Sequence, residues 1–393
     1  MKIRLNKIIL MGNGFDISHG LKTRYQDFIL YYLLNCLDKT KQKDLPDVYE
    51  FEDDCIKIHW NSRFFRDGLK DVKEYITNSF TSGTGLGNIV IRHKTRKSNY
   101  INIDLEIIAK NDFILSILRE CLYSDWGGIE DSIYSFLKQS HINLKGFRDD
   151  ISISKANSAA YKAERSNIQN LNSSVDCLKQ NLIYYLKTQN SPTTFNQHLF
   201  DSRMEWGAIY DYSILSDDNY LRDVLFLNFN YTTYYLSENN YTYIIDTFSD
   251  ISTSYEFINI HGDIDDSIDD IIFGVGDEQD SMYSEIETLY DNEWLKNMKS
   301  FHYFRKDYYQ QVLGFIAKGD YEIFVIGHSC SITDRTLLNM LFENDSCKKI
   351  HVYHYQGMNS YLNTTYNIAR NFKNKVKLRE VLMPYNPNLN MNP

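Results

Sequence analysis

The chain has few cysteines, and they are widely spaced. None of the six belongs to a Cys-x-x-Cys pair. Such pairs are typical of structural zinc sites, and closely spaced even sets of cysteines are typical of disulfide-rich secreted domains. The spacing argues against both, so we expect reduced thiols, no metal cofactor and a cytoplasmic protein. The cysteines are Cys36, Cys55, Cys121, Cys177, Cys330 and Cys347.

The sequence also lacks a long apolar run. A membrane-spanning helix needs roughly 18 or more consecutive apolar residues, and no stretch approaches that length. The first apolar run, residues 7–11, is too short for the core of a signal peptide. We therefore expect no membrane partner.

An excess of positive charge is absent as well. The 42 Lys and Arg residues are outnumbered by 52 Asp and Glu residues, which gives a formal net charge of −10. A nucleic-acid partner would need a local basic patch. The densest basic segment, IRHKTRK (residues 91–97), is expected to be a solvated loop. Nucleic acid is therefore not an expected partner.

Apolar residues are abundant enough for a large core. Of 393 residues, 43% are hydrophobic, which suffices for two domains or for one domain with a large insertion. Near-continuous apolar runs are typical of strands that are buried on both faces of a parallel sheet. The clearest are KIILM (7–11), VLFLNF (224–229) and YEIFVIG (321–327), and weaker runs occur at 257–262, 271–275 and 349–355.

The C-terminal part predicts a strand–helix–strand unit. After YEIFVIG, the segment SITDRTLLNMLFEND (331–345) has the spacing of an amphipathic helix with Ser331 as its N-cap, and the run at 349–355 follows. Such units build doubly wound folds. We predict an α/β fold with a Rossmann-like parallel sheet.

Residues 41–215 have a different pattern. Apolar residues recur at helical spacing in residues 100–123 and 126–139, and the polar stretch 151–189 contains neither proline nor glycine. We predict an all-α helical insertion domain at 41–215. It would split the nucleotide-binding domain into residues 1–40 and 216–393.

A glycine loop directly follows the first predicted strand. In MGNGFD (11–16), Gly12 and Gly14 would allow backbone N–H groups to approach a phosphate at the carboxyl end of the strand, and Asp16 would add a carboxylate. The third glycine of the dinucleotide fingerprint is absent, since Ile17 stands there. A plain tight turn is the alternative interpretation.

Three more loops carry polar groups after predicted strands. In LNFNYT, Asn228 and Asn230 either form an Asx-type turn or hold a substrate hydroxyl or a water. His261 ends a short strand, where a structural role competes with a catalytic one. Ser329 precedes a helix without the Gly-x-Ser-x-Gly of a nucleophile elbow. One parallel sheet would gather Gly12 and these side chains at one edge.

Together these motifs resemble the AbiH family of bacterial abortive-infection proteins. MGNGFDISHGLKTRYQDF, the Trp126 and Glu130 of WGGIEDSI, LNFNYT, IHGD, IIFGVGD and IGHSCSITD follow one another in the family's order. The resemblance implies an anti-phage abortive-infection effector. It does not imply a role for Trp126 or Glu130.

The order of the loops is also similar, more distantly, to the sirtuins and to sirtuin-like NAD hydrolases of phage defence. Asp16 stands where that family has a loop serine, and Thr232 stands where it has an aspartate, which puts the ribose contacts in doubt. The four zinc cysteines of sirtuins are missing, which argues against a deacetylase. The likeness places the NAD contacts on Gly12, Asn13, Gly14, Phe15, Gly327, Ser329 and Asp334.

The resemblance implies cleavage of the nicotinamide N-glycosidic bond of NAD without a metal. A positive charge develops on the ribose, and a water must be positioned beside it. His261 is the expected general base, Asn230 would orient the water or a ribose hydroxyl, and Asp16 would offer a carboxylate to the cation.

Two alternatives remain open. The chain could sense NAD or an ADP-ribose-type nucleotide without turning it over. It could also be a nuclease-type effector that uses Asp263, Asp265 and Asp266 with magnesium, although the net charge counts against this. A homo-oligomer or a partner subunit would control the effector, and the phage trigger cannot be read from the sequence.

Overall fold

The computed structural model describes most of the chain, and the described residues form two compact units. The first unit comprises Met1–Thr23, Gln189–Asp280 and Met298–Pro393, and the second comprises Arg24–Thr188 and Ser281–Asn297. The described residues are 5–43, 47–81, 89–93, 104–123, 128–146, 159–189, 192, 199, 223–236 and 254–391.

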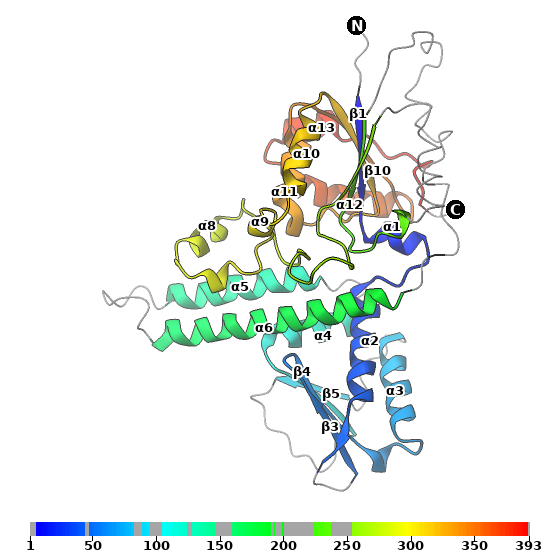
Figure 1. Cartoon of the computed structure of the whole chain (residues 1–393), viewed down its shortest axis with the longest axis vertical. Coiled ribbons are helices and arrows are strands. Elements are labelled where there is room, and N and C mark those ends of the chain that lie inside the picture. Colours follow the sequence, from blue (N-terminus) through cyan, green and yellow to red (C-terminus); the bar gives the residue numbers. More distant parts are fainter. Residues whose placement is uncertain are drawn as a thin grey trace. The chain divides into compact units, whose positions relative to one another are not determined.

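A five-stranded parallel sheet forms the centre of the first unit (Figure 1). Its spatial order is β10-β9-β1-β7-β8, and every neighbouring pair is parallel. The predicted α/β class with a Rossmann-like sheet is confirmed. The strands are β1 (Asn6–Met11), β7 (Asp223–Asn228), β8 (Ser254–Asn259), β9 (Tyr321–Ile326) and β10 (Cys347–Val352).

The strand order reverses between β1 and β9. Numbered along the chain, the strands lie in the order 3-2-1-4-5, which is that of dinucleotide-binding folds. Ligands of such sheets bind beyond the carboxyl ends of the two strands that flank the reversal. Here the loops at that point begin with Gly12 and Gly327.

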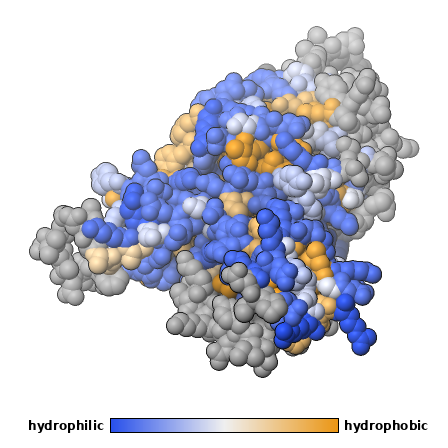
Figure 2. All heavy atoms as spheres, turned by 60° about the horizontal axis from the view of Figure 1, so that its bottom comes forward, coloured by the Kyte–Doolittle hydropathy of each residue, from blue (hydrophilic) through white to orange (hydrophobic). Residues whose placement is uncertain are grey.

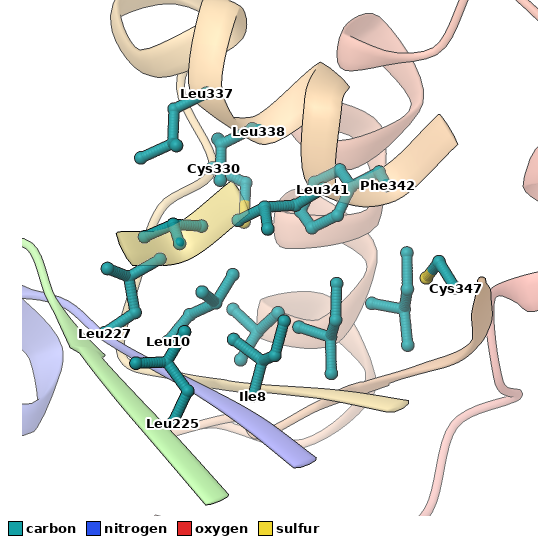
Figure 3. Packing of buried hydrophobic residues seen from close by; sticks show 14 of the residues in the cluster. Ile8, Leu10, Leu225, Leu227, Cys330, Leu337, Leu338, Leu341, Phe342 and Cys347 are labelled. Atoms are coloured by element: carbon teal, nitrogen blue, oxygen red, sulfur yellow. The ribbon is translucent and has the colours of Figure 1, made fainter. Parts of the chain in front are cut away.

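Both faces of this sheet are covered, which explains the near-continuous apolar runs. All six residues of β1 and all six of β9 are buried. Figure 3 shows Leu337, Leu338 and Leu341 of α11 above Ile8 and Leu10 of β1. Helices of this unit are α1 (Asn13–Ser18), α9 (Lys299–His302), α10 (Tyr308–Ile316), α11 (Arg335–Glu343), α12 (Met358–Asn371) and α13 (Lys375–Val381).

The second unit contains a sheet of its own, in the order β2-β3-β4-β6-β5. Its pairs are antiparallel except for β5 with β6. The strands are β2 (Lys41–Gln42), β3 (Val48–Glu52), β4 (Ile56–Asn61), β5 (Ile89–His93) and β6 (Leu105–Ala109). The helices are α2 (Tyr25–Asp38), α3 (Leu69–Thr81), α4 (Asp112–Tyr123), α5 (Ile129–Gly146), α6 (Ala159–Lys187) and α8 (Ser281–Glu287).

The expectation that residues 41–215 are entirely helical is therefore wrong. The segment 100–123 was assigned to a helix, but it contains β6, and α4 begins only at Asp112. In β6 all five residues are buried, and the strand pairs with β4 and β5. Alternation of apolar and polar residues at Leu105, Glu106 and Ile107 is the strand signal that helical spacing concealed.

The structure also differs from three smaller expectations. Residues 271–275 form no strand, and Val275 makes only an isolated bridge to Met298. Strand β5 takes in residues 91–93 of the segment that was expected to be a loop. Ser331 was expected to cap the helix, but its hydroxyl accepts from the N–H of Thr333 and so caps the short turn Ile332–Asp334, and Asp334 is the N-cap of α11. Trp126 lies outside the described residues.

Hydrophilic residues cover most of the described surface that faces the viewer in Figure 2. Among the helices that the structure describes, none is both long enough and apolar enough to cross a membrane.

Candidate functional site

The loops after β1 and β9 pack directly against each other. A Cβ atom at Gly12 would lie 2.4 Å from the Cα of His328, and one at Gly14 would lie 2.7 Å from the Cα of Gly327. Gly327 has φ +69°, and its Cβ would lie 2.1 Å from the backbone N of Phe15. The glycines at the reversal point thus allow the two backbone segments to pack closely, because a side chain at these positions would overlap the other loop.

Backbone N–H groups of the first loop already have acceptors. Gly12 donates to the carbonyl of Ile326 at 3.1 Å, Gly14 donates to that of Gly327 at 2.8 Å, and Phe15 donates to that of Gly12 at 2.8 Å. These are three of the four N–H groups that the sequence assigned to the NAD pyrophosphate. A phosphate could bind them only if the two loops separate.

A buried polar group links β1 to β7 at the same edge. Asp16 of α1 is 2% exposed. Its Oδ1 accepts from Asn230 Nδ2 at 3.0 Å, and its Oδ2 accepts from Thr232 Oγ1 at 2.5 Å. Asn230 Nδ2 also donates to the carbonyl of Gly12 at 3.0 Å. The structure therefore brings together Asp16 and Asn230, two of the three predicted catalytic side chains.

Burial changes the protonation of Asp16. Desolvation raises its pKa from 3.8 to about 7, although the hydrogen bonds from Thr232 and Asn230 oppose the rise. Its side-chain hydrogen-bond partners, Asn230 and Thr232, are both neutral, so neither supplies a positive charge to offset the cost of burying the carboxylate. Asp16 is therefore a group that exchanges a proton near neutral pH.

Stability should fall as this carboxyl ionises. The unfolded chain binds this proton only below about pH 4, whereas the folded chain holds it up to about pH 7. Between these values the free energy of unfolding should decrease with rising pH, by at most about 1.4 kcal/mol per unit. In the Asp16→Asn variant, the free energy of unfolding should decrease less over this pH range. At pH 8 the variant should be more stable than the unmodified chain. Urea unfolding at pH 5 and pH 8 measures both, and equal slopes would contradict the assignment.

Asn228, the other asparagine of this motif, ends β7. Its Oδ1 accepts from the N–H of Asn230 at 3.1 Å, and its Nδ2 donates to the carbonyl of Thr232 at 2.9 Å. This is the Asx-type turn that was one of the two interpretations. The turn presents Asn230 and Thr232 to Asp16.

His261 follows β8 and is 4% exposed. Its Nδ1 lies 3.1 Å from the carbonyl oxygen of Phe229, which can only accept, so we assign the proton to Nδ1. Its Nε2 lies 3.2 Å from Asp334 Oδ1, and the two groups form an ion pair when the ring is protonated. In the neutral ring, Nε2 then carries the lone pair, which is the form a general base requires.

Asp334 is the centre of a buried group of charges, which we call the Asp334 cluster: Asp334, Lys299, His261 and His328. Lys299 Nζ lies 2.7 Å from Asp334 Oδ1, and His328 Nε2 lies 3.6 Å from Oδ2. Burial by itself would raise the pKa of Asp334, but the Lys299 ammonium and the His261 ring hold it well below its usual value. The Asp334 carboxylate is therefore ionised.

The FGVGD motif (273–277) positions the Asp334 cluster. The Lys299 N–H donates to the carbonyl of Val275 at 2.7 Å, and the Gly276 N–H donates to that of Thr333 at 2.7 Å. Buried Asp277 accepts from Arg335 Nη1 at 2.9 Å and 3.0 Å. This motif thus holds the backbone of Lys299 in place and does not form the strand that was expected at residues 271–275.

The predicted contacts of the cofactor are only partly accessible. Asn13 and Ser329 are exposed at the edge, and Gly14 and Gly327 are half-buried. Phe15 is fully buried, and its ring packs in the core that includes Tyr235. A cavity of about 260 Å³ is lined by residues of β10 and of the segment 383–389, and by none of the predicted site residues.

Sequence reasoning missed Lys299 and His328. Lys299 lies outside every predicted motif, and a single lysine carries no recognisable signal. His328 belongs to IGHSCSITD, but in that motif only Gly327, Ser329 and Asp334 were considered as candidate site residues. Cys330 N–H donates to its Nδ1 at 3.0 Å, so His328 carries its proton on Nε2, toward Asp334.

Comparison with known proteins gives one result. A family model described as "Bacteriophage abortive infection AbiH" matches residues 8–355. This match confirms the family resemblance that was predicted from the motifs. No curated protein and no solved structure matches the chain.

Proposed function

The chain belongs to the AbiH family and has a role in bacteriophage abortive infection, and we propose that it acts there as an NAD hydrolase that cleaves the nicotinamide N-glycosidic bond. One observation carries the proposal. His261 Nε2 lies 3.2 Å from Oδ1 of the ionised Asp334, at the carboxyl edge of a sheet with the strand order of dinucleotide-binding folds.

The chemistry needs a base and a negative charge. As the bond between the ribose C1′ and the pyridinium nitrogen breaks, nicotinamide leaves as a neutral molecule and positive charge grows on the ribose. A water adds to C1′ and gives its proton to His261 Nε2, so the products are nicotinamide, ADP-ribose and a proton. Asp334 stabilises the imidazolium that forms, and its charge favours the developing cation.

Asn230 has a narrower role than the sequence suggested. Its Nδ2 donates to Gly12 and Asp16, so only its carbonyl oxygen can accept from a water or a ribose hydroxyl. Asp16, which is protonated over much of the range below pH 7, orients Asn230 rather than facing the ribose as a fixed charge. It acts as a positioning residue in this proposal.

Binding of NAD requires the two glycine loops to separate. The N–H groups of Gly12 and Gly14 then exchange their carbonyl acceptors for phosphate oxygens. Asn13 and Ser329 are exposed at this edge and make the first contacts.

Turnover of etheno-NAD by the purified chain tests the proposal. His261→Ala should lower the rate by about 10²-fold or more, the usual scale for loss of a general base, and Asn230→Ala should also lower it. His354→Ala is the matched control, because His354 is a buried histidine of the same unit that bonds the Asn386 carbonyl. Activity that survives both site substitutions would refute the assignment.

The closed loops favour a second function, a nucleotide sensor without turnover. The loops that begin at Gly12 and Gly327 pack together, and the N–H groups of Gly12 and Gly14 are bonded to carbonyl oxygens. Nucleotide binding would therefore change the conformation of these loops, and that change would be the signal. Calorimetry that detects NAD or ADP-ribose binding, with no nicotinamide released on chromatography, would select this function over hydrolysis.

A further inference from the structure

A group of metal-capable side chains lies in the second unit, apart from the sheet edge described above. One carboxylate oxygen of Asp53 and the Sγ atoms of Cys55 and Cys177 all lie within 4.8 Å of one another. Asp53 and Cys55 precede β4, and Cys177 belongs to α6. We propose that Asp53, Cys55 and Cys177 bind a zinc ion.

The carboxylate is held in place before any metal arrives. Asp53 Oδ1 accepts from the backbone N–H groups of Cys55 and Ile56, both at 2.9 Å. Tyr32 of α2 donates its hydroxyl to Oδ2 at 2.7 Å. Ligating carboxylates are characteristically fixed by such outer hydrogen bonds, which reduce the entropy lost on metal binding.

The two sulfurs are placed by different elements. Cys55 is fully buried, and its thiol donates to the carbonyl of Ser174 in α6 at 3.4 Å. Cys177 is half-buried, and Asn181 Nδ2 lies 3.7 Å from its Sγ as a hydrogen-bond donor. Metal ions bind the thiolate form of cysteine.

The geometry and ligand types favour zinc. With Zn–S bonds of about 2.3 Å in a tetrahedron, two sulfurs lie about 3.8 Å apart, which fits the spacing of this group. Two thiolates and a carboxylate supply three ligands, and Asp53 and Cys177 are not fully buried, so a water can occupy the fourth position. Thiolate ligands disfavour magnesium and calcium, which prefer oxygen.

A nearby thiol supplies a comparison for the proposed ligands. Cys36 of α2 is buried and outside the group of three ligands. It belongs to the same helix as Tyr32, whose hydroxyl donates to Asp53. Cys36→Ser and Cys121→Ser are therefore control variants for the two proposed cysteine ligands.

Cobalt(II) substitution of the full chain tests the proposal without reference to its activity. After chelator treatment and dialysis under reducing conditions, CoCl₂ should produce a sulfur-to-cobalt charge-transfer band in the near ultraviolet. ZnCl₂ should abolish the band, and about one zinc per chain should remain on elemental analysis. The charge-transfer band needs no variant, so it is informative even if a substitution impairs folding.

The variants separate ligands from neighbours. Cys55→Ser and Cys177→Ser should each weaken zinc binding at least tenfold. Tyr32→Phe should weaken it about 10–100-fold, as is usual for an outer hydrogen bond, while Cys36→Ser and Cys121→Ser should bind as the unmodified chain does. Absence of the band would overturn the proposal, as would equal losses in the control variants. A Cys55–Cys177 disulfide, found by peptide mass mapping of freshly purified chain, would also overturn it.

Discussion

Replacing Lys299 by methionine is expected to lower the free energy of unfolding by about 3–5 kcal/mol, the usual cost of removing one partner of a buried ion pair. Lys299 is fully buried, and its Nζ lies 2.7 Å from Asp334 Oδ1. Without the Lys299 ammonium, the Asp334 carboxylate stays buried but loses the lysine that offsets its charge. Urea unfolding followed by circular dichroism measures the loss.

Two control variants decide whether charge is the cause. Lys318→Met removes a lysine whose partners, Asp223 and Glu256, are partly exposed, so it should cost less than about 1 kcal/mol. Adding Asp334→Asn to Lys299→Met removes the stranded charge and should restore part of the stability. If the double variant is no more stable than Lys299→Met, loss of packing rather than an unpaired charge explains the effect.

Gly327→Ala is expected to destabilise the chain by about 2–5 kcal/mol. Its φ of +69° costs an alanine about 1–2 kcal/mol. The added Cβ would also lie 2.1 Å from the backbone N of Phe15 and 2.4 Å from the carbonyl carbon of Gly14. Backbone cannot yield as a flexible side chain does, so overpacking adds about 1–3 kcal/mol. Equilibrium unfolding in urea measures the sum.

Gly20→Ala separates the two costs. Gly20 has φ +83°, and nothing lies within 4 Å of the position of its Cβ. This substitution should therefore cost only the conformational part, about 1–2 kcal/mol. Equal losses at Gly20 and Gly327 would mean that the two loops are not locked together at the reversal point.

The interlocked loops also bear on function. Loss of the Gly14–Gly327 contact would free N–H groups for a ligand but would also break the hydrogen bonds that hold the two loops together. In the proposed NAD hydrolase, ligand binding and loop opening are consequently one event. An effector that would harm its host gains from such coupling, because the closed state withholds the site.

Prediction from sequence worked best where the signal is local. The buried runs at 7–11, 224–229 and 321–327 identified β1, β7 and β9, because a strand covered on both faces must be apolar throughout. The loops with Asn230 and His261 follow β7 and β8 at one edge, as parallel strands require. Prediction failed for the sheet within residues 41–215: β6 lies in a segment that was expected to be a helix, and residues 91–93 of β5 lie in one that was expected to be a loop.

The sequence by itself determined the parallel sheet, the edge at which its polar loops gather and the family, because buried strands and motif order are properties of neighbouring residues. Only the tertiary structure decided that Lys299 and His328 join His261 at Asp334, and that Asp53, Cys55 and Cys177 meet. Those contacts join residues far apart in the chain. Their distances depend on how helices pack and loops close, which no spacing along the sequence encodes.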